Sequence, residues 1–465
     1  MIVMKFGGTS VKDAEAVRRV VQVVGRERRP RLVVVSALSK VTDALLEVAR
    51  LAEQGDGTAA RQAVKALHRR HEEMAALVRA TERRASLLAV IDALFEELEG
   101  IVRALAVVEE VSPRSRDAIV AFGELASSRL VAAAIEDAGL PSRWLDARAV
   151  LVTDAQHGAA LPDREATDER LRSSVPSLLA EGLVPVVGGF VGATPAGLTT
   201  TLGRGGSDFS AALFGAGLRA EEIQIWTDVD GMLTADPRVV AAPRVVPQIS
   251  FDEASELAYF GAKVLHPASI RPAVERGIPV VVLNSFNPQA RGTRITRSAL
   301  HAVGEPRAFA FKKGITVLIV SQPRMLMAHG FLARIFEAFN RHRTPVDLIA
   351  TSEVSVSLTV DDPSRLDAVR AELAELGEVQ QLGGMAIVSV VGRGFTQRPG
   401  LAARVFDALR DVNILMISFG ASDVNVSFVV TLTAVRAAWV MSMLISNSSP
   451  ASSRLSALPV ITVVV

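Results

Sequence analysis

The chain of 465 residues contains no cysteine, which excludes disulfide bonds, thiolate catalysis and cysteine-ligated metal sites. Lysine and arginine number 51 against 50 aspartates and glutamates, so the formal net charge is only +1. This balance offers no surplus of charge for nucleic acid or for a membrane surface. Apolar runs such as 32–35 and 278–283 are strand length, far below the roughly 18 residues of a spanning helix. The first residues also lack the layout of a signal peptide. We therefore expect a cytoplasmic protein with no nucleic-acid or membrane partner.

The commonest nucleotide-binding motifs are absent as well. No glycine is followed by Lys-Ser or Lys-Thr at the spacing of a Walker A loop, and the glycines at 203–206 do not fit G-x-G-x-x-G. The H-R-D and D-F-G elements of protein kinases are missing too. If the chain binds a nucleotide, it uses another scaffold.

Hydrophobic patterning predicts a parallel α/β sheet, and the length predicts two or three domains. Residues 2–6 form an apolar strand, a glycine turn follows, a helix spans about 13–25, and 31–36 is a second strand. Further buried strands are expected at 183–187, 223–228 and 278–283. Glycine-rich and polar loops follow most of these strands, at the carboxyl edge where open α/β sheets bind ligands.

Residues 199–208 read Thr-Thr-Thr-Leu-Gly-Arg-Gly-Gly-Ser-Asp, and helical spacing resumes at Phe209. Small residues that open a helix let backbone N–H groups face an anion. Phosphoryl transfer needs cations and backbone donors around the moving group, and the candidates are Lys5, Gly7, Gly8, Arg204, Gly205, Gly206 and Lys263. Asp208 could orient a lysine or help to hold Mg²⁺. The alternative is a set of turns with surface charges, in which Lys5 only reaches solvent from a strand edge.

Residues 43–110 are expected to be a charged helical flank. His68 and His71 lie on one helix without an evident third ligand, so we interpret both as surface residues and expect no metal site. Glu124 is placed at a helix start, where it either serves a site or pairs with the helix dipole.

An internal repeat follows a stretch without apolar periodicity at 295–307. Residues 330–360 align with 400–430 at a constant offset of 70, and ten of the 31 positions are identical. Each copy is expected to contain a strand, a helix and two further strands. Duplicated small α/β modules usually bind small molecules or self-associate.

Four motif blocks resemble the signature sequences of aspartokinases: 4–10 (MKFGGTS), 200–208 (TTLGRGGSD), 226–231 (WTDVDG) and 260–267 (FGAKVLHP). The resemblance implies an amino-acid-kinase fold, a mainly parallel sheet between helical layers, followed by two ACT-like α+β modules. It implies ATP-dependent phosphorylation of the side-chain carboxylate of L-aspartate to 4-phospho-L-aspartate, the first step of lysine, threonine and methionine biosynthesis. Mg²⁺ would be held mainly by the nucleotide phosphates. The implied catalytic residues are Lys5, Gly7, Gly8 and Asp208. The implied aspartate-binding residues are Ser36, Thr42, Glu124, Phe190, Arg204 and Ser207, and the implied ATP-binding residues are Lys5, Gly8, Thr227, Asp228, Arg238 and Lys263.

The repeat resembles the paired ACT modules of lysine-inhibited aspartokinases, which form effector pockets between two chains. The resemblance therefore implies L-lysine as effector and a homodimer through the ACT modules, or a tetramer. The implied effector-binding residues are Met325, Gly330, Phe331, Leu332, Val346, Asp347, Thr351, Ser352 and Glu353, with Asp347 and Glu353 suited to an ammonium group.

The expected division is a catalytic domain at 1–294, a linker at 295–306, a regulatory region at 307–447 with repeats at about 315–380 and 385–447, and an irregular tail at 448–465. Two other functions stay open from the sequence. One is a kinase that forms an acyl phosphate on another amino acid, such as glutamate. The other is a non-catalytic amino-acid sensor.

Overall fold

The computed structural model describes residues 1–237, 243–260, 265–298, 305–322 and 329–432. The chain forms two compact units. The first contains residues 1–233 and 245–301, and the second contains 234–244 and the chain from 302 onward. The division expected from the sequence placed residues 234–244 in the catalytic domain, whereas the structure groups them with the second unit. The stretch 295–306, expected as a linker, overlaps the last residues of one strand and the first of another.

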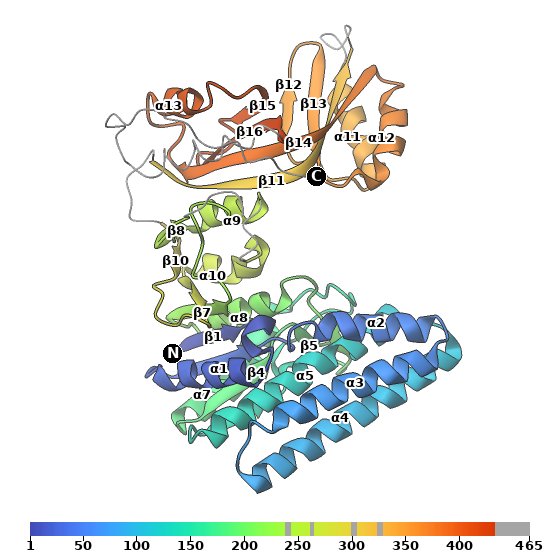
Figure 1. Cartoon of the computed structure of the whole chain (residues 1–465), viewed down its shortest axis with the longest axis vertical. Helices are drawn as coiled ribbons and strands as arrows, with labels where there is room; N and C mark the ends of the chain where they lie inside the picture. The colour runs from blue at the N-terminus through green and yellow to red at the C-terminus, as the bar shows by residue number, and fades with distance from the viewer. Residues whose placement is uncertain (238–242, 261–264, 299–304, 323–328, 433–465) are drawn as a thin grey trace, which may run out of the picture. The chain divides into compact units, whose positions relative to one another are not determined.

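The strands of the first unit are β1 (Ile2–Phe6), β2 (Arg31–Val35), β3 (Ser142–Leu145), β4 (Val184–Gly188), β5 (Val191–Ala193), β6 (Thr199–Thr201), β7 (Glu222–Thr227), β8 (Gln248–Ser250), β9 (Val280–Asn284) and β10 (Thr293–Thr296). Its helices are α1 (Ala14–Arg26), α2 (Val41–Glu53), α3 (Gly57–Ala75), α4 (Thr81–Val108), α5 (Pro113–Asp137), α6 (Ala147–Val150), α7 (Arg164–Ala180), α8 (Gly206–Gly217), α9 (Phe251–Tyr259) and α10 (Arg271–Arg276) (Figure 1).

Eight of these strands form one sheet in the order β3-β4-β2-β1-β7-β9-β10-β8. Every neighbouring pair is parallel except β9 and β10. All five residues of β1 are buried, as expected for a strand covered by helices on both faces. The predicted mainly parallel sheet is confirmed. The chain leaves β1 toward β2 on one side and later adds β7 on the other, so the loops at the ends of these strands diverge. Such a switch point is where open α/β sheets bind ligands.

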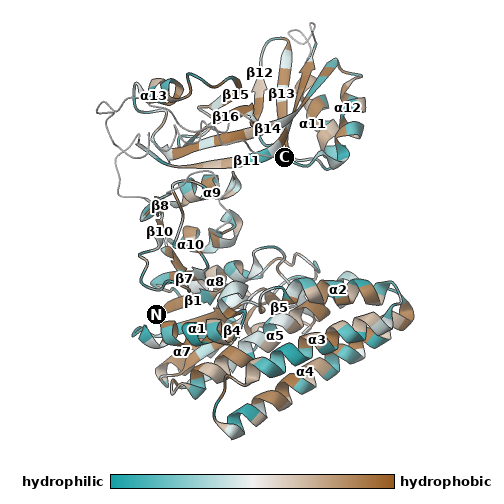
Figure 2. Ribbon diagram, viewed as in Figure 1, coloured by the Kyte–Doolittle hydropathy of each residue, from teal (hydrophilic) through white to brown (hydrophobic). Residues whose placement is uncertain are grey.

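Helices α2 to α4 form the predicted helical flank, and hydrophilic residues lie along α3 and α4 (Figure 2). Helix α5 is long and apolar enough to cross a membrane, but 83% of its apolar window is buried inside the protein. It is the core helix of this unit. Glu124 lies in the middle of α5, so the prediction of a helix start there was wrong. The helix begins at Pro113 after the capping side chain of Ser112, and the glycine at 123 does not interrupt it.

The prediction that both histidines are surface residues was wrong for His71. Its side chain is fully buried beside Leu67 and Met74, because helical spacing places it on the inward face of α3. The Nδ1 atom lies 2.8 Å from the Leu67 carbonyl oxygen, and the ring packs against Phe95 of α4. Burial lowers the pKa of His71 to about 4, so this imidazole is neutral at pH 7. His68 is half-buried and hydrogen-bonds Asp92 at 2.8 Å.

The second unit contains β11 (Glu305–Ser321), α11 (Phe331–Arg341), β12 (Ile349–Thr351), β13 (Ser355–Val360), α12 (Leu366–Leu373), β14 (Glu378–Arg393), α13 (Leu401–Ala408), β15 (Ile414–Phe419) and β16 (Asn425–Thr431). Its strands form a six-stranded sheet in the order β12-β13-β11-β14-β16-β15. The order reflects the repeat: α11, β12 and β13 of the first copy correspond to α13, β15 and β16 of the second. The expected strand, helix, strand, strand sequence of each copy is confirmed.

The two central strands are shared between the modules. Residues 308–313 of β11 pair with 386–391 of β14, and Phe309 belongs to the hydrophobic core of the second copy. Residues 316–321 of β11 pair with 355–360 of β13 on one side, and 317–321 also pair with 378–382 of β14 on the other. Leu318 belongs to the hydrophobic core of the first copy. Each long strand therefore contributes to both modules, which the repeat alignment alone did not indicate.

Candidate active site

The carboxyl ends of β1, β2, β4 and β7 open on one pocket of about 950 Å³. The predicted catalytic, acceptor and nucleotide residues that lie in the described parts of the chain all line it: Lys5, Gly7, Gly8, Ser36, Thr42, Glu124, Phe190, Arg204, Ser207, Asp208, Thr227 and Asp228. Arg238 and Lys263 lie outside the described residues. The structure thus brings together segments from Lys5 to Asp228, which are far apart in the sequence.

The glycine loop leads directly into α8, which begins at Gly206, three residues earlier than the apolar spacing suggested. Gly205 precedes the helix with φ of +73°, and no side chain caps the first turn. A Cβ on Gly205 would lie 2.6 Å from Ser269 Oγ, so both backbone conformation and space require glycine. Ser207 and Asp208 are therefore first-turn residues at an uncapped helix N-terminus, where negative charge is favoured.

Lys5 is paired, so the surface alternative for this residue is wrong. Its residue exposure is 8%, and its Nζ lies 2.6 Å from Asp208 Oδ1. A Cβ on Gly7 would be 3.5 Å from the same Nζ, which places the ammonium beside the glycine turn. The pair joins the end of β1 to the first turn of α8. It puts a cation and a carboxylate at the floor of the pocket, as a phosphoryl-transfer site requires.

Only one of the two carboxyl oxygens of Glu124 accepts a hydrogen bond from the described residues. Its Oε1 accepts a hydrogen bond from the Ala37 N–H at 3.1 Å, whereas Oε2 is buried without a hydrogen-bond partner in the described parts of the chain. Burial raises the pKa of Glu124 to about 8, although the Ala37 N–H and the charge of Lys5 act in the opposite direction. A Cβ on Gly123 would approach Ala37 Cβ to 2.8 Å, so the glycine allows α5 to sit close to the loop after β2. This carboxyl group is arranged to receive a cation.

Phe190 forms a pocket wall in a strained backbone conformation, with φ of +64°. Ser210 Oγ accepts a hydrogen bond from its N–H at 2.9 Å, and its carbonyl accepts one from Leu202 at 3.0 Å. A Cβ on Gly206 would lie 2.6 Å from the Phe190 ring, so the aromatic side chain packs directly on the start of α8. The loop after β4 and the glycine loop thus form one rigid wall.

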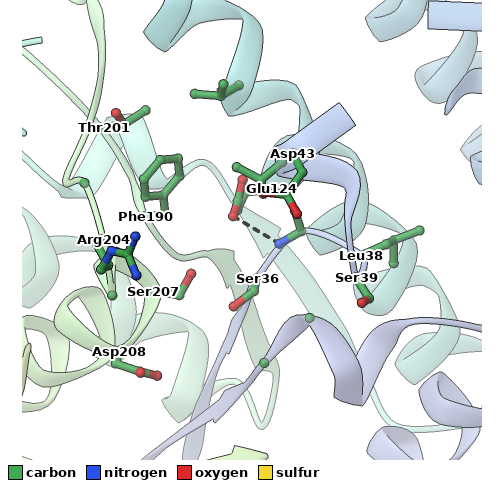
Figure 3. A pocket seen from close by; sticks show the side chains of 18 of the residues that line it. Ser36, Leu38, Ser39, Asp43, Glu124, Phe190, Thr201, Arg204, Ser207 and Asp208 are labelled. Atoms are coloured by element: carbon green, nitrogen blue, oxygen red, sulfur yellow. Dashed lines mark hydrogen bonds between the residues drawn. The ribbon is translucent and has the colours of Figure 1, made fainter. Parts of the chain in front are cut away.

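The Arg204 side chain contributes a cation to that wall of the pocket. It makes no ion pair with any residue that the structure describes. Figure 3 shows the Arg204 guanidinium and the Ser207 side chain on the side of the pocket opposite Ser36 and Glu124, with Asp208 farther along the same wall. A guanidinium binds a carboxylate through two parallel hydrogen bonds. The pocket therefore offers an anion site, a cation site and, at Lys5 and Asp208, a separate charged floor.

Sequence reasoning missed several residues that line the same pocket, above all Asp117 and Lys40. Asp117 is seven residues before Glu124 on α5, hence on the same helical face, and this spacing could have identified it. Asp208 and Asp228 are two of the carboxylates that line the pocket and could help to hold a cation. Outside the pocket, His68, Glu72 and Asp92 offer ligand atoms within 4.8 Å of one another, but the hydrogen bond from His68 to Asp92 already accounts for that cluster.

The predicted effector residues that the structure describes differ in exposure. Gly330 precedes α11 with φ of +78°, Phe331 is buried, Leu332 is exposed and Val346 is half-buried. Thr351, Ser352 and Glu353 are exposed at the end of β12 and in the turn after it, and Met325 lies outside the described residues. The Asp347 carboxylate is buried and already receives Lys312 Nζ at 2.9 and 3.0 Å.

Comparison with known proteins agrees with this architecture. Residues 1–284 match the amino acid kinase family, and 315–372 and 388–439 match the ACT domain. The fold and the pocket are thus those of an amino acid kinase with a regulatory ACT region.

The chain is 38% identical to lysine-sensitive aspartokinase 3 of Escherichia coli over 92% of this chain and 95% of that protein. It is 38% identical to chloroplastic aspartokinase 1 of Arabidopsis thaliana over 92% of this chain and 77% of that protein. The solved structure of E. coli aspartokinase III with lysine and aspartate, in the T-state, superposes with a TM-score of 0.83 at 37% identity, covering 96% of this chain and 99% of that one. The R-state structure with aspartate and ADP gives 0.79 at 35% identity, covering 96% and 100%.

The chain belongs to the aspartokinases. Its reaction is the ATP-dependent phosphorylation of the aspartate side-chain carboxylate.

Proposed function

We propose that the pocket divides this reaction between a phosphoryl floor and an acceptor wall. Lys5, Gly7 and Gly8 would stabilise the charge on the phosphoryl group in flight, and Asp208 would hold the Lys5 ammonium in place through the 2.6 Å contact. Charge stabilisation by preorganised groups is a major contribution to catalysis of this type.

The acceptor aspartate would bind across the pocket. Its ammonium would pair with Glu124, its α-carboxylate with Arg204, and Ser36, Thr42, Phe190 and Ser207 would complete the contacts. The observation that carries this assignment is the buried, unpartnered Oε2 of Glu124, since such an atom costs free energy until a cation reaches it. The opposite wall supplies a guanidinium without an ion-pair partner among the described residues.

The nucleotide would lie toward Thr227 and Asp228, whose side chains hydrogen-bond each other at 3.1 Å at the end of β7. Gly8 and Lys5 would face its terminal phosphates, and Arg238 and Lys263 are proposed from the sequence alone. Mg²⁺, held mainly by the phosphates, would offset their charge.

For regulation, we propose L-lysine as the effector and a homodimer through the ACT modules, with a tetramer as a further possibility, in the cytoplasm. The name of the E. coli relative and the lysine in its T-state structure support this proposal. The effector site would involve the residues around Gly330, Asp347 and Ser352. The division into catalytic, linker and regulatory regions remains part of the same proposal.

ADP release should be measured with aspartate and with glutamate, each with and without lysine. We expect ADP release with aspartate, little with glutamate, and inhibition by lysine. Comparable kcat/KM on glutamate would favour the kinase for another amino acid. No turnover with either substrate would favour the sensor, and inhibition by threonine alone would contradict the effector.

A further inference from the structure

We propose that Asp117 is a positioning residue for acceptor binding, because it fixes the loop that carries Arg204. The inference rests on the proposed contact between Arg204 and the α-carboxylate of aspartate. Asp117 belongs to neither the phosphoryl floor nor the acceptor contacts described above, although it lines the same pocket.

Asp117 is a charged side chain held almost entirely by neighbouring donors. Its exposure is 2%. The backbone N–H of Gly158 donates to both carboxylate oxygens at 3.0 Å, and His157 Nδ1 lies 2.9 Å from Oδ2. The Thr201 hydroxyl donates to Oδ1 at 2.6 Å, and the Thr201 N–H donates to Oδ2 at 3.2 Å. One carboxylate therefore joins α5, the 157–158 turn and the end of β6.

These donors lie next to the glycine loop. Thr201 is three residues before Arg204 and is the last residue of β6. Its carbonyl accepts a hydrogen bond from the Ala160 N–H at 2.9 Å, which ties the 157–160 segment to the same strand. A Cβ on Gly203 would lie 3.1 Å from the Gly158 carbonyl oxygen, so the turn also supports the loop directly. The residues that precede Arg204 are thus fixed by the partners of Asp117.

Helix α5 then determines both ends of the acceptor site. Glu124 faces the pocket two turns after Asp117, and an α-helix keeps such residues on one face at about 1.5 Å of rise per residue. The helix presents the carboxyl group for the substrate ammonium directly. Through Asp117 it also fixes the position of the guanidinium for the substrate carboxylate.

The test is steady-state kinetics of Asp117→Asn in the full chain. The amide places an NH₂ group against donors that now face a carboxylate, so at least one buried contact to Thr201, Gly158 or His157 is lost. We expect the KM for aspartate to rise about 10-fold or more, the KM for ATP to stay within about twofold, and kcat to fall less than the aspartate KM rises. A structural role alone would lower the thermal midpoint without separating the two KM values.

The matched control is Asp137→Asn at the other end of α5. Asp137 also accepts two backbone N–H groups, from Arg79 and Ala80, but it lies about 30 Å farther along the helix. We expect this variant to keep both KM values. An equal aspartate KM shift in both variants, or no shift in Asp117→Asn, would overturn the proposal.

The second arm removes the other partner, in case Asp117→Asn folds poorly. Thr201→Val should raise the aspartate KM, and Thr201→Ser, which keeps the hydroxyl, should restore it to near the wild-type value. Equal aspartate KM values in the two variants would contradict the role of this hydrogen bond. Arg204→Met separates the two proposals: if its aspartate KM is normal, the proposed role of Arg204 fails, whereas a raised value with a normal Asp117→Asn rejects only the positioning role.

Discussion

Glu124 in the first unit and Asp347 in the second are both buried carboxyl groups that we expected to hold an amino-acid ammonium. The two sites differ in what the chain supplies. Glu124 keeps Oε2 without a hydrogen-bond partner in the described parts of the structure, and burial raises its pKa to about 8. Asp347 already binds Lys312, which also lies 2.9 Å from Asp361. Burial alone would lower the pKa of Lys312, but the hydrogen bonds to Asp347 and Asp361 raise it.

The difference shows two ways to manage a buried carboxyl group. Glu124 is neutral in the empty pocket at neutral pH, so a substrate ammonium must first displace a proton. Asp347 pairs with an ammonium of the chain itself, so an effector must displace that group or bind beside it. The chain supplies no hydrogen-bond partner for Glu124 Oε2 among the described residues, whereas it supplies the Lys312 ammonium to Asp347.

Lys5→Met removes the cation that pairs with Asp208 at the floor of the pocket. We expect kcat to fall by about 10³-fold or more, because the charge on the phosphoryl group loses its main stabilising partner, while the KM for aspartate changes little. ADP release measures this, and Lys12→Met, at an exposed lysine, is the control. Wild-type-like turnover would reject the role of Lys5.

Glu124→Gln should raise the KM for aspartate about 10- to 100-fold, because a charged hydrogen bond to the ammonium is lost. Glu136→Gln, at an exposed position of the same helix, is the control. An unchanged KM would mean that the ammonium binds elsewhere.

The pH dependence of aspartate binding follows from the same carboxyl group. Since the pKa of Glu124 in the empty pocket is about 8, wild-type affinity should increase as the pH rises from 6 to 8, with release of a proton on binding. Glu124→Gln cannot titrate, so its affinity should be flat over this range. Calorimetry in buffers of different ionisation enthalpy measures the released proton, and its absence in the wild type would contradict the raised pKa.

Lys312→Met tests the ion pair between Lys312 and Asp347 in the second unit. The change removes a cation that pairs with Asp347 at 2.9 Å and would compete with an effector ammonium, so we expect lysine to inhibit at a several-fold lower concentration and to stabilise the variant more than the wild type. Lys313→Met is the matched control, since the Lys313 ammonium lies over the Phe311 ring, 5.4 Å from its centroid. Loss of lysine inhibition would show instead that Lys312 is part of the effector site.

His71 is a buried titratable group that does not line the candidate active site. Its folded pKa lies below the unfolded value of about 6.5, so the unfolded chain takes up the proton first as the pH falls. Stability should therefore decrease between about pH 6.5 and 4, on the order of 2 kcal/mol, and His71→Gln should lose less. Denaturant unfolding at pH 7 and pH 5 measures the difference, and equal acid sensitivity of the two proteins would contradict the assignment.

Apolar patterning was sufficient for the buried strands, because β2, β4 and β9 are almost entirely apolar, and only Lys5 interrupts β1. The motif blocks identified residues that the structure places in one pocket. Contacts between distant segments left no local signal: neither the bonds of Asp117 to Gly158 and Thr201 nor the pairing of Lys312 with Asp347 follows from spacing. The burial of His71 was in principle readable from its helical register.

The shared strands of the second unit also constrain the order in which that unit can fold. Ala308 pairs with Val391, so the first half of β11 lacks the strand that pairs with it there until roughly eighty further residues have been synthesised. During that interval an apolar strand edge is exposed, and such edges promote aggregation. We infer that refolding of this unit is slower than its small modules would suggest, and that a chain cut between the two copies leaves β11 without half of its pairing.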